Sequence, residues 1–179
     1  DCATLQPLHR LDRHTSGLVL FSIQPATRGR YQNLFRDQAI DKQYEAIAPA
    51  LPQHLFPLWR RSRIERDGQF FRSSEVAGDL NAATQIAVLE DLGKHWRYAL
   101  SPTTGKKHQL RLHLAALGAP ILNDALYPQV DDVLAEDYQR PLQLLARQVT
   151  FTDPITGSER RFVSQLTLTG ASPLVTATD

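Results

Sequence analysis

Residues 9–17 form a dense cluster of chemically active side chains near the start of the chain, with the sequence HRLDRHTSG. The five residues that follow, 18–22, are almost wholly apolar and predict a buried strand. A charged loop attached to a core strand is a common way for a protein to present catalytic side chains. We therefore expect Asp12 to be the reactive group of this loop, as a nucleophile or as a base.

The charges beside Asp12 bear on its ionisation. Arg10 and Arg13 flank it in the sequence, and a nearby guanidinium lowers the pKa of a carboxyl. This arrangement predicts that Asp12 is ionised. An Asp that caps a turn and pairs with a neighbouring Arg gives the same pattern, so these residues alone leave both interpretations open.

A second cluster occupies residues 104–113, with the sequence TGKKHQLRLH. The pattern predicts a helix over about 107–117, because a Gly and a Pro follow where a helix is expected to end. On this helix His108 and Arg111 share one face, three residues apart. Leu110 lies on another face, which would hold the helix to the core.

Lys106 and Lys107 fall at the start of the expected helix. Free N–H groups and the helix dipole favour an anion such as phosphate at this end. A solvated basic first turn would have the same sequence, but basic residues there oppose the helix dipole. The pattern therefore favours an anion site only mildly.

Two further groups of residues are suited to nucleic acid. Tyr44, beside Lys42 on an expected strand over 42–48, could stack on a nucleobase, although a half-buried strand Tyr is the commoner case. Arg and aromatic side chains also alternate around the basic run at 60–63, with Trp59 before it and residues 70–72 on the expected partner strand. A solvated hairpin face would fit this second group equally well.

Two kinds of cofactor site are excluded by spacing. Gly105-Lys106 does not form a phosphate-binding P-loop, because the required upstream Gly and the Ser or Thr after the Lys are absent. His108 and His113 are five residues apart and do not share a helical face, which argues against a zinc site. We therefore expect no metal and no nucleotide cofactor.

The bulk composition indicates a soluble globular protein. The 179 residues are 42% hydrophobic and 22% charged, with a net charge of +1, and they fit one domain over 1–179. No apolar run approaches the ~20 residues that span a bilayer. The single cysteine, Cys2, is compatible with a reducing cytoplasm. We expect a cytoplasmic protein that is a monomer.

The expected elements place these residues on an α+β fold. A helix begins near Pro25 and buries Tyr31, Leu34 and Phe35. Strands that pair locally follow, with hairpin signals around Asp67-Gly68 and around residues 153–157. Few helices interrupt them, so the sequence predicts a mainly antiparallel sheet with a few flanking helices.

Taken together, four motifs resemble those of the RluA-like RNA pseudouridine synthases. They are the loop at 9–17, Lys42-x-Tyr44-x-Ala46, the cluster at 104–113, and Ile121-x-x-Asp124-x-x-Tyr127. The resemblance runs from about residue 8 to about residue 162. It implies a mixed, mainly antiparallel sheet with a central active-site cleft and no cofactor. It also implies that the chain converts uridine to pseudouridine in ribosomal or transfer RNA.

The resemblance also implies roles for individual residues. Asp12 would be the catalytic carboxylate, with Arg111 paired to it and Tyr44 stacked on the uracil. Arg10 would enter the RNA stack and point away from Asp12. The remaining residues expected to bind substrate are Leu110, Lys106, His108 and Thr15. Lys106 stands where the family usually has Arg, which keeps the charge but loses the two-pronged phosphate contact.

Two alternatives remain open at this point. One is a non-catalytic RNA-binding module with the same fold. A glycoside hydrolase is weaker, because such enzymes usually need two facing carboxylates. Family members also carry a further segment before the Asp motif, whereas only eight residues precede His9 here. We therefore expect an N-terminally truncated catalytic domain.

Overall fold

The computed structural model describes residues 3–68, 71–132 and 137–170. Two helices in these ranges are α1 (Pro25–Arg36) and α2 (Gln109–Ala116). The strands are β1 (Gln6–Pro7), β2 (Ser16–Gly17), β3 (Phe21–Ser22), β4 (Asp41–Pro49), β5 (Leu58–Arg66), β6 (Ser73–Val76), β7 (Ala82–Asp91), β8 (His95–Pro102), β9 (Leu144–Thr152) and β10 (Glu159–Val163).

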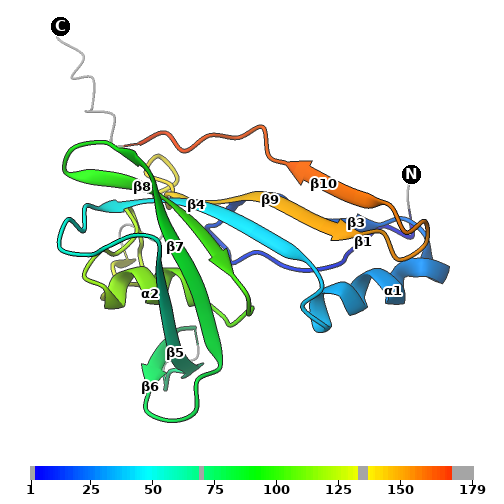
Figure 1. Ribbon diagram of the computed structural model, residues 1–179, viewed down its shortest axis with the longest axis horizontal. Helices are drawn as coiled ribbons and strands as arrows, with labels where there is room; N and C mark the ends of the chain where they lie inside the picture. The colour runs from blue at the N-terminus through cyan, green and yellow to red at the C-terminus, as the bar shows by residue number, and fades with distance from the viewer. Residues whose placement is uncertain (1–2, 69–70, 133–136, 171–179) are drawn as a thin grey trace, which may run out of the picture.

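One large sheet organises the molecule (Figure 1). Its strand order is β10-β9-β4-β8-β7-β5-β6, and these neighbours are all antiparallel. The short strand β2 joins β9 in parallel, and β1 pairs with β3 in a separate two-stranded ribbon. The predicted α+β fold with a mixed, mainly antiparallel sheet is confirmed.

The strand expected over residues 18–22 is only partly correct. Residues 16–17 pair with β9 and residues 21–22 pair with β1, so the chain changes partner between them. The backbone N–H of Leu18 donates to the carbonyl of Ala146 at 3.1 Å, and that of Leu20 donates to Nε2 of His9 at 3.0 Å. The apolar run is therefore anchored without forming one continuous strand.

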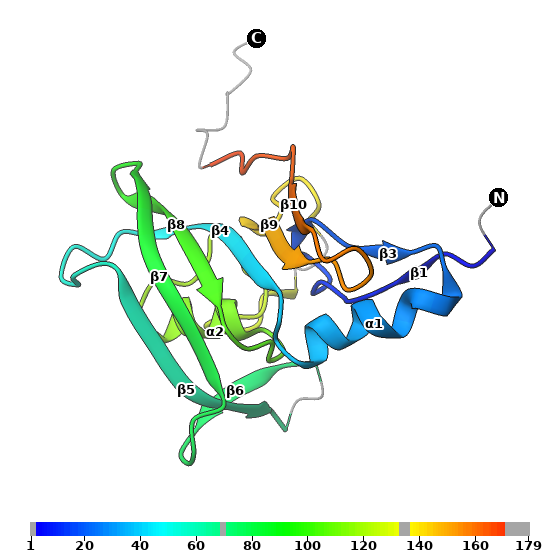
Figure 2. The same cartoon turned by 45° about the vertical axis from the view of Figure 1, so that its right-hand side comes forward.

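Helix α1 packs with the expected apolar face, although its residues are only half-buried. Pro25 begins it, where its missing N–H costs nothing. Its three apolar residues Tyr31, Leu34 and Phe35 pack against a small core cluster formed by Ile40, Val149 and Phe151. This contact attaches α1 to the side of the sheet that carries β9 (Figure 2).

Helix α2 begins two residues later than its sequence predicts. His108 precedes it with φ of 58°, in the left-handed region, so regular helix starts at Gln109. Leu110 and Leu114 pack into the main core with Ile86 and Leu100 of the sheet. Every residue from 109 to 114 is buried, and α2 therefore carries its polar side chains into the interior.

Candidate active site

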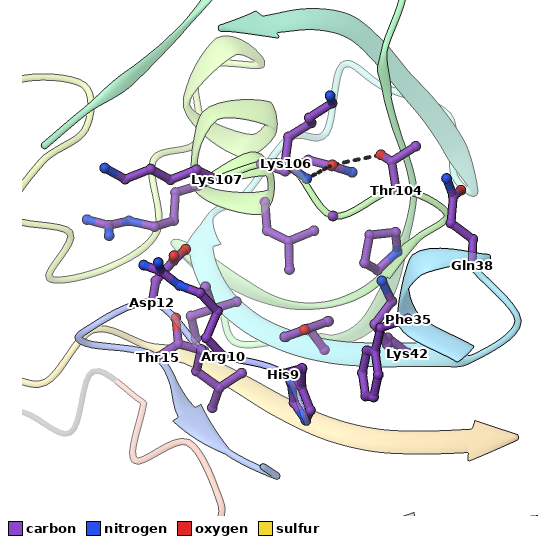
Figure 3. Close-up of a pocket in the computed structure, with 18 of the residues that line it drawn as sticks. His9, Arg10, Asp12, Thr15, Phe35, Gln38, Lys42, Thr104, Lys106 and Lys107 are labelled. Carbon is purple, nitrogen blue, oxygen red and sulfur yellow. Dashed lines mark hydrogen bonds between the residues drawn. The ribbon is translucent and has the colours of Figure 1, made fainter. Parts of the chain in front are cut away.

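A cavity of about 470 Å³ lies where the loop at 8–15, strand β4 and the turn before α2 meet. Seven of the eight residues expected in the site line it, namely Asp12, Tyr44, Arg111, Arg10, Leu110, Lys106 and Thr15. Figure 3 shows Asp12, Arg10 and Thr15 on one side and Lys106 and Lys107 on the other. Motifs that are up to about a hundred residues apart in the sequence thus share one cavity.

The loop that carries Asp12 is held by a tight turn and by a close approach to the sheet. The N–H of Thr15 donates to the backbone carbonyl of Asp12 at 2.9 Å, which closes a tight turn. Two residues later Gly17 adopts a φ of +112° against the backbone of Ala146 in β9. A Cβ at this position would collide with the Ala146 carbonyl. The glycine therefore allows the loop to approach the sheet closely.

Opposing effects act on the carboxyl of Asp12. Burial raises its pKa, while the charges of Arg111, Arg10 and Lys107 and the backbone N–H of His108 lower it. Arg10 thus lowers the pKa as expected, but the expected net lowering is wrong, because the overall direction is upward. Desolvation outweighs the cations because the carboxyl lies in the wall of a cavity.

Arg111 does not make the expected ion pair with Asp12. Its guanidinium instead forms a two-pronged pair with Asp124, with Nε 2.7 Å from Oδ2 and Nη2 bonded to Oδ1. Both side chains are almost fully buried, and the Arg111 guanidinium also lies 5.3 Å from the ring centre of Tyr127. Arg111 nevertheless exerts the strongest electrostatic influence on Asp12 of any charge in the site.

The partner of Arg111 was not identified from the sequence. It is Asp124, and the only sequence signal for it was its position in the fourth motif. Its carboxylate also accepts hydrogen bonds from the backbone N–H groups of Leu126 and Tyr127 at 2.8 and 3.1 Å. Asp124 therefore holds Arg111 while the positive charge of Arg111 still acts on the cavity.

Tyr44 lies on β4 at a break in the sheet. The register of β4 against β9 shifts between Gln43 and Tyr44, and a bulge of this kind redirects a side chain. Burial raises the pKa of Tyr44 to about 12, and the charge of Asp12 acts in the same direction. The phenol therefore stays protonated at neutral pH, with Asp12 near it in the same cavity.

The Arg10 side chain differs from its expected direction. It is exposed, lines the cavity, and lowers the pKa of Asp12, so it does not point away from that carboxyl. Figure 3 shows its guanidinium beside Asp12. A side chain in this position can still contact RNA, because its other side faces solvent.

Further cations surround the cavity. Lys42 and Arg66 line it in addition to Lys106 and Lys107. Burial lowers the pKa of Lys42. We expected Lys106 and Lys107 to lie in the first turn of the helix, but both precede its first residue, Gln109. The basic character of this rim remains, since the lysines lie on the turn that enters α2.

Gln109 holds this turn in place through four hydrogen bonds. Its Oε1 accepts from the hydroxyl of Thr104 at 2.7 Å and from the N–H of Lys106 at 3.1 Å, drawn as dashed lines in Figure 3. Its Nε2 donates to the carbonyl of Ala83 and the hydroxyl of Thr84, both at 3.0 Å. The sequence pattern included Gln109 without assigning it a role.

His108 does not line the cavity. Its ring is buried behind Asp12, with Nε2 4.0 Å from Oδ1 of that carboxyl and Nδ1 2.9 Å from the hydroxyl of Tyr127. Burial and neighbouring cations lower the pKa of His108 to about 3. We expected His108 to bind substrate, but its side chain lies behind Asp12 and does not reach the cavity.

The basic run at 60–63 lies on β5, outside the cavity. Arg60 pairs with Glu75 and Arg63 pairs with Glu65, whereas Arg61 lies 5.3 Å from the ring centre of Trp59. Residues 69 and 70, which belong to the expected partner strand, lie outside the described residues. An RNA-binding role for this run stays a prediction.

The described residues show no group of three or more His, Cys, Asp or Glu side chains that could hold a metal ion. His9 instead bonds the backbone and stacks on Phe35 with ring centres 4.5 Å apart. In the same residues no helix has the length and apolar character needed to cross a membrane.

Comparison with known families identifies one match to this chain. The family model described as RNA pseudouridylate synthase matches residues 3–116. Among curated proteins, the dual-specificity RNA pseudouridine synthase RluA of Haemophilus influenzae is 35% identical over 162 residues, covering 88% of this chain and 71% of that protein. The ribosomal large subunit pseudouridine synthase C of Rickettsia typhi is 28% identical, and the chain covers 54% of its length.

Solved structures give the same result for the fold. Human RNA pseudouridylate synthase domain containing 4 is 29% identical with a TM-score of 0.68, covering 91% of this chain and 72% of that chain. Human RNA pseudouridylate synthase domain containing 1 superposes with a TM-score of 0.73, covering 89% of this chain and 68% of that one. At 23% identity it supports the fold alone.

Proposed function

This chain belongs to the RNA pseudouridylate synthase family, and we propose that it isomerises uridine to pseudouridine in structured RNA. The observation that carries the proposal is the Asp12 carboxylate, the only one among the described residues that line the cavity, beside a protonated phenol and a rim of cations. Curated relatives are named as synthases acting on large-subunit ribosomal RNA and on transfer RNA. These two RNA classes are the proposed substrates.

The reaction rearranges one nucleotide without any net change in composition. The N1–C1′ bond of uridine breaks, the uracil turns within the cavity, and C5 bonds to C1′. The proton on C5 is lost and N1 gains one. Because atoms and electrons balance within the nucleotide, the proposed reaction needs no redox cofactor.

We assign Asp12 to the ribose side of this rearrangement, where it acts on the sugar as nucleophile or base. Arg111 supplies positive charge to the cavity while Asp124 holds it in position. Tyr44 stacks on the detached base, since its ring lies in the same cavity. Leu110 and Thr15 form part of the wall that excludes water.

The target nucleotide must leave its RNA stack to reach Asp12. Extruding a base costs a few kcal/mol, and contacts to the RNA backbone offset this cost. Arg10 and Lys106 are suited to this task, because both are exposed at the cavity and carry positive charge. Phosphate contacts of this kind fix the position of the RNA without reading its sequence.

Several properties of the chain remain part of the proposal. We propose a single catalytic domain over residues 1–179, acting as a monomer in the cytoplasm. The chain spans about seven tenths of one curated relative and about half of another. The activity of the whole protein is therefore inferred from this domain and its cavity.

Release of the C5 proton tests the proposal directly. Ribosomal and transfer RNA transcripts that carry tritium at C5 of uridine are incubated with the protein. We expect tritium to pass into water in step with pseudouridine detected after digestion of the RNA. Binding of the same transcripts without tritium release would instead identify a non-catalytic RNA-binding module.

A further inference from the structure

The buried hydroxyl of Tyr127 lies at the centre of a small hydrogen-bond cluster behind Asp12. It accepts from the backbone N–H of Ser73 at 2.9 Å and lies 3.0 Å from the carbonyl oxygen of the same residue. Nδ1 of His108 is its third neighbour, at 2.9 Å. Tyr127 and Ser73 are 3% and 2% exposed. Water therefore has little access to a hydrogen-bonding group of this cluster that lacks a protein partner.

Counting protons in this cluster fixes its arrangement. A phenol has a single proton to donate. If that proton pointed at His108, the oxygens of Tyr127 and Ser73 would face each other at 3.0 Å as two acceptors, which is unfavourable in a buried site. If it points at the Ser73 carbonyl, all three contacts are satisfied, provided that Nδ1 of His108 carries a hydrogen.

We infer that Ser73 and Tyr127 lock His108 with its proton on Nδ1, so that its bare Nε2 turns a lone pair, not an N–H, toward the Asp12 carboxylate. Nε2 lies 4.0 Å from Oδ1 of Asp12. His108 is thus a positioning residue, which acts through Asp12 and does not itself line the cavity. The tautomer of His108 is inferred from the structure alone, and only its effect on the reaction rests on the proposed function.

The charges around His108 keep its ring neutral. Arg111 on α2, Lys107 in the preceding turn, Arg10 in the Asp12 loop and Arg72 before β6 all lower its pKa, in addition to burial. At neutral pH the ring is therefore neutral and carries one proton, which resides on either Nδ1 or Nε2. The position of one hydrogen decides whether His108 presents an N–H or a lone pair to Asp12.

A nitrogen lone pair directed at Asp12 from 4.0 Å disfavours the carboxylate anion relative to the neutral carboxyl. It acts in the same direction as burial, and against Arg111, Arg10, Lys107 and the backbone N–H of His108. Tyr44 on β4 lines the same cavity as Asp12, and the charge of Asp12 raises the pKa of its phenol. A carboxyl with a raised pKa is better suited to take up a proton during the reaction, as the ideal catalytic pKa lies near the working pH.

Nitrogen NMR of the ring tests the inference without any RNA. In the wild-type protein labelled with 15N-histidine, we expect His108 to show a protonated Nδ1 and a bare Nε2. In Tyr127→Phe the ring that contacts Arg72 and Arg111 is kept, but the acceptor for Nδ1–H is lost. The proton should then move to Nε2, towards Asp12. His108 protonated at Nε2 in the wild type, or unchanged in the variant, would overturn the inference.

His113 provides an internal control in the same spectra. Its buried ring bonds Ser62 through Nε2 at 3.1 Å and Thr84 through Nδ1 at 2.9 Å, and has no contact with Tyr127 among these bonds. Its signals should be the same in wild type and Tyr127→Phe, which also shows that the fold is kept. A parallel change at His113 would mean a general loss of structure.

The effect on the reaction is measured separately, on a transcript that the wild type modifies. In Tyr127→Phe, the Nε2–H dipole would point toward Asp12, 4.0 Å away, and stabilise its anion electrostatically. The acid limb of the kcat profile should therefore move to lower pH, with KM for RNA nearly unchanged. An unmoved acid limb in a variant whose tautomer has changed would contradict the link to Asp12, and the NMR result would stand independently of the proposed function.

Discussion

Two opposing effects act on the carboxyl of Asp12. Partial burial in the cavity wall disfavours its charged form, and the surrounding cations favour it. Burial prevails, so folding raises its pKa. Between the unfolded and folded pKa values the native state binds more protons than the unfolded state, and stability falls as pH rises through that window. At neutral pH, ionised Asp12 therefore destabilises the fold.

Replacing Asp12 by Asn should make the protein more stable at neutral pH. The gain should shrink as pH falls, and should vanish below the pKa of an unfolded Asp, near about 4, because the carboxyl is then protonated in both states. Urea unfolding of wild type and Asp12→Asn across this pH range measures the difference. A variant that is less stable at neutral pH would show that the cations outweigh burial.

Asp124 should behave in the opposite way. Asp124→Asn removes one partner of a buried ion pair and leaves the Arg111 guanidinium without its counter-charge. We expect a loss of about 3–5 kcal/mol in the free energy of unfolding, measured by denaturant titration. The exposed pair between Arg36 and Asp37 supplies the control, since Asp37→Asn should leave the unfolding midpoint nearly unchanged.

Among the elements, the sequence was most informative where a pattern repeats. Helix α1 and strands β4, β7 and β8 follow from periodicity, because many residues in each contribute to the same signal. The start of α2 could not be predicted, since it depends on the left-handed backbone of His108. The bulge beside Tyr44 also left no local signal, because it depends on the pairing of β4 with β9.

The site shows the same division. The motifs identified the residues that line the cavity, because their types and order are specific. They did not reveal that Arg111 bonds Asp124, or that His108 lies behind Asp12. Both facts depend on distances between buried side chains from different elements. The upward shift of the Asp12 pKa was also missed, because it results from burial, and the residues adjacent to Asp12 in the sequence do not indicate how buried it is.

The contact between β2 and β9 can be tested with a pair of glycine substitutions. Gly17→Ala puts a Cβ into the backbone of Ala146 at a φ of +112°. We expect it to cost at least about 2 kcal/mol of stability and to reduce activity by displacing the Asp12 loop. Gly29→Ala in α1, where a Cβ meets nothing within 4 Å, should stabilise by about 0.5–1 kcal/mol. Thermal and urea unfolding distinguish the two.

For the molecule as a whole, the distribution of charge matters more than its sum. The net charge is only +1, yet five cations line the cavity besides Arg111, namely Arg10, Lys42, Arg66, Lys106 and Lys107. A local positive field attracts phosphate even though the net charge of the chain is close to zero. RNA binding should therefore be concentrated at this face and should weaken with added salt.

Salt titration of RNA affinity measures this contribution. For Lys106→Ala we expect weaker binding and a slope of log Kd against log salt that is smaller by about one. Lys94→Ala is the matched control, because Lys94 lies in the turn between β7 and β8, at the far end of β8 from the cavity. An equal change of slope in both variants would show that RNA contacts the protein without preference for the cavity.

The proposed isomerisation of uridine depends on Asp12. Its most direct test is the pseudouridine content of a ribosomal or transfer RNA transcript after incubation with wild type or with Asp12→Asn, alongside the affinity of each for that transcript. We predict that the variant forms no detectable pseudouridine while it binds the RNA about as tightly as the wild type. Pseudouridine formed by Asp12→Asn at a rate close to that of the wild type would contradict the account.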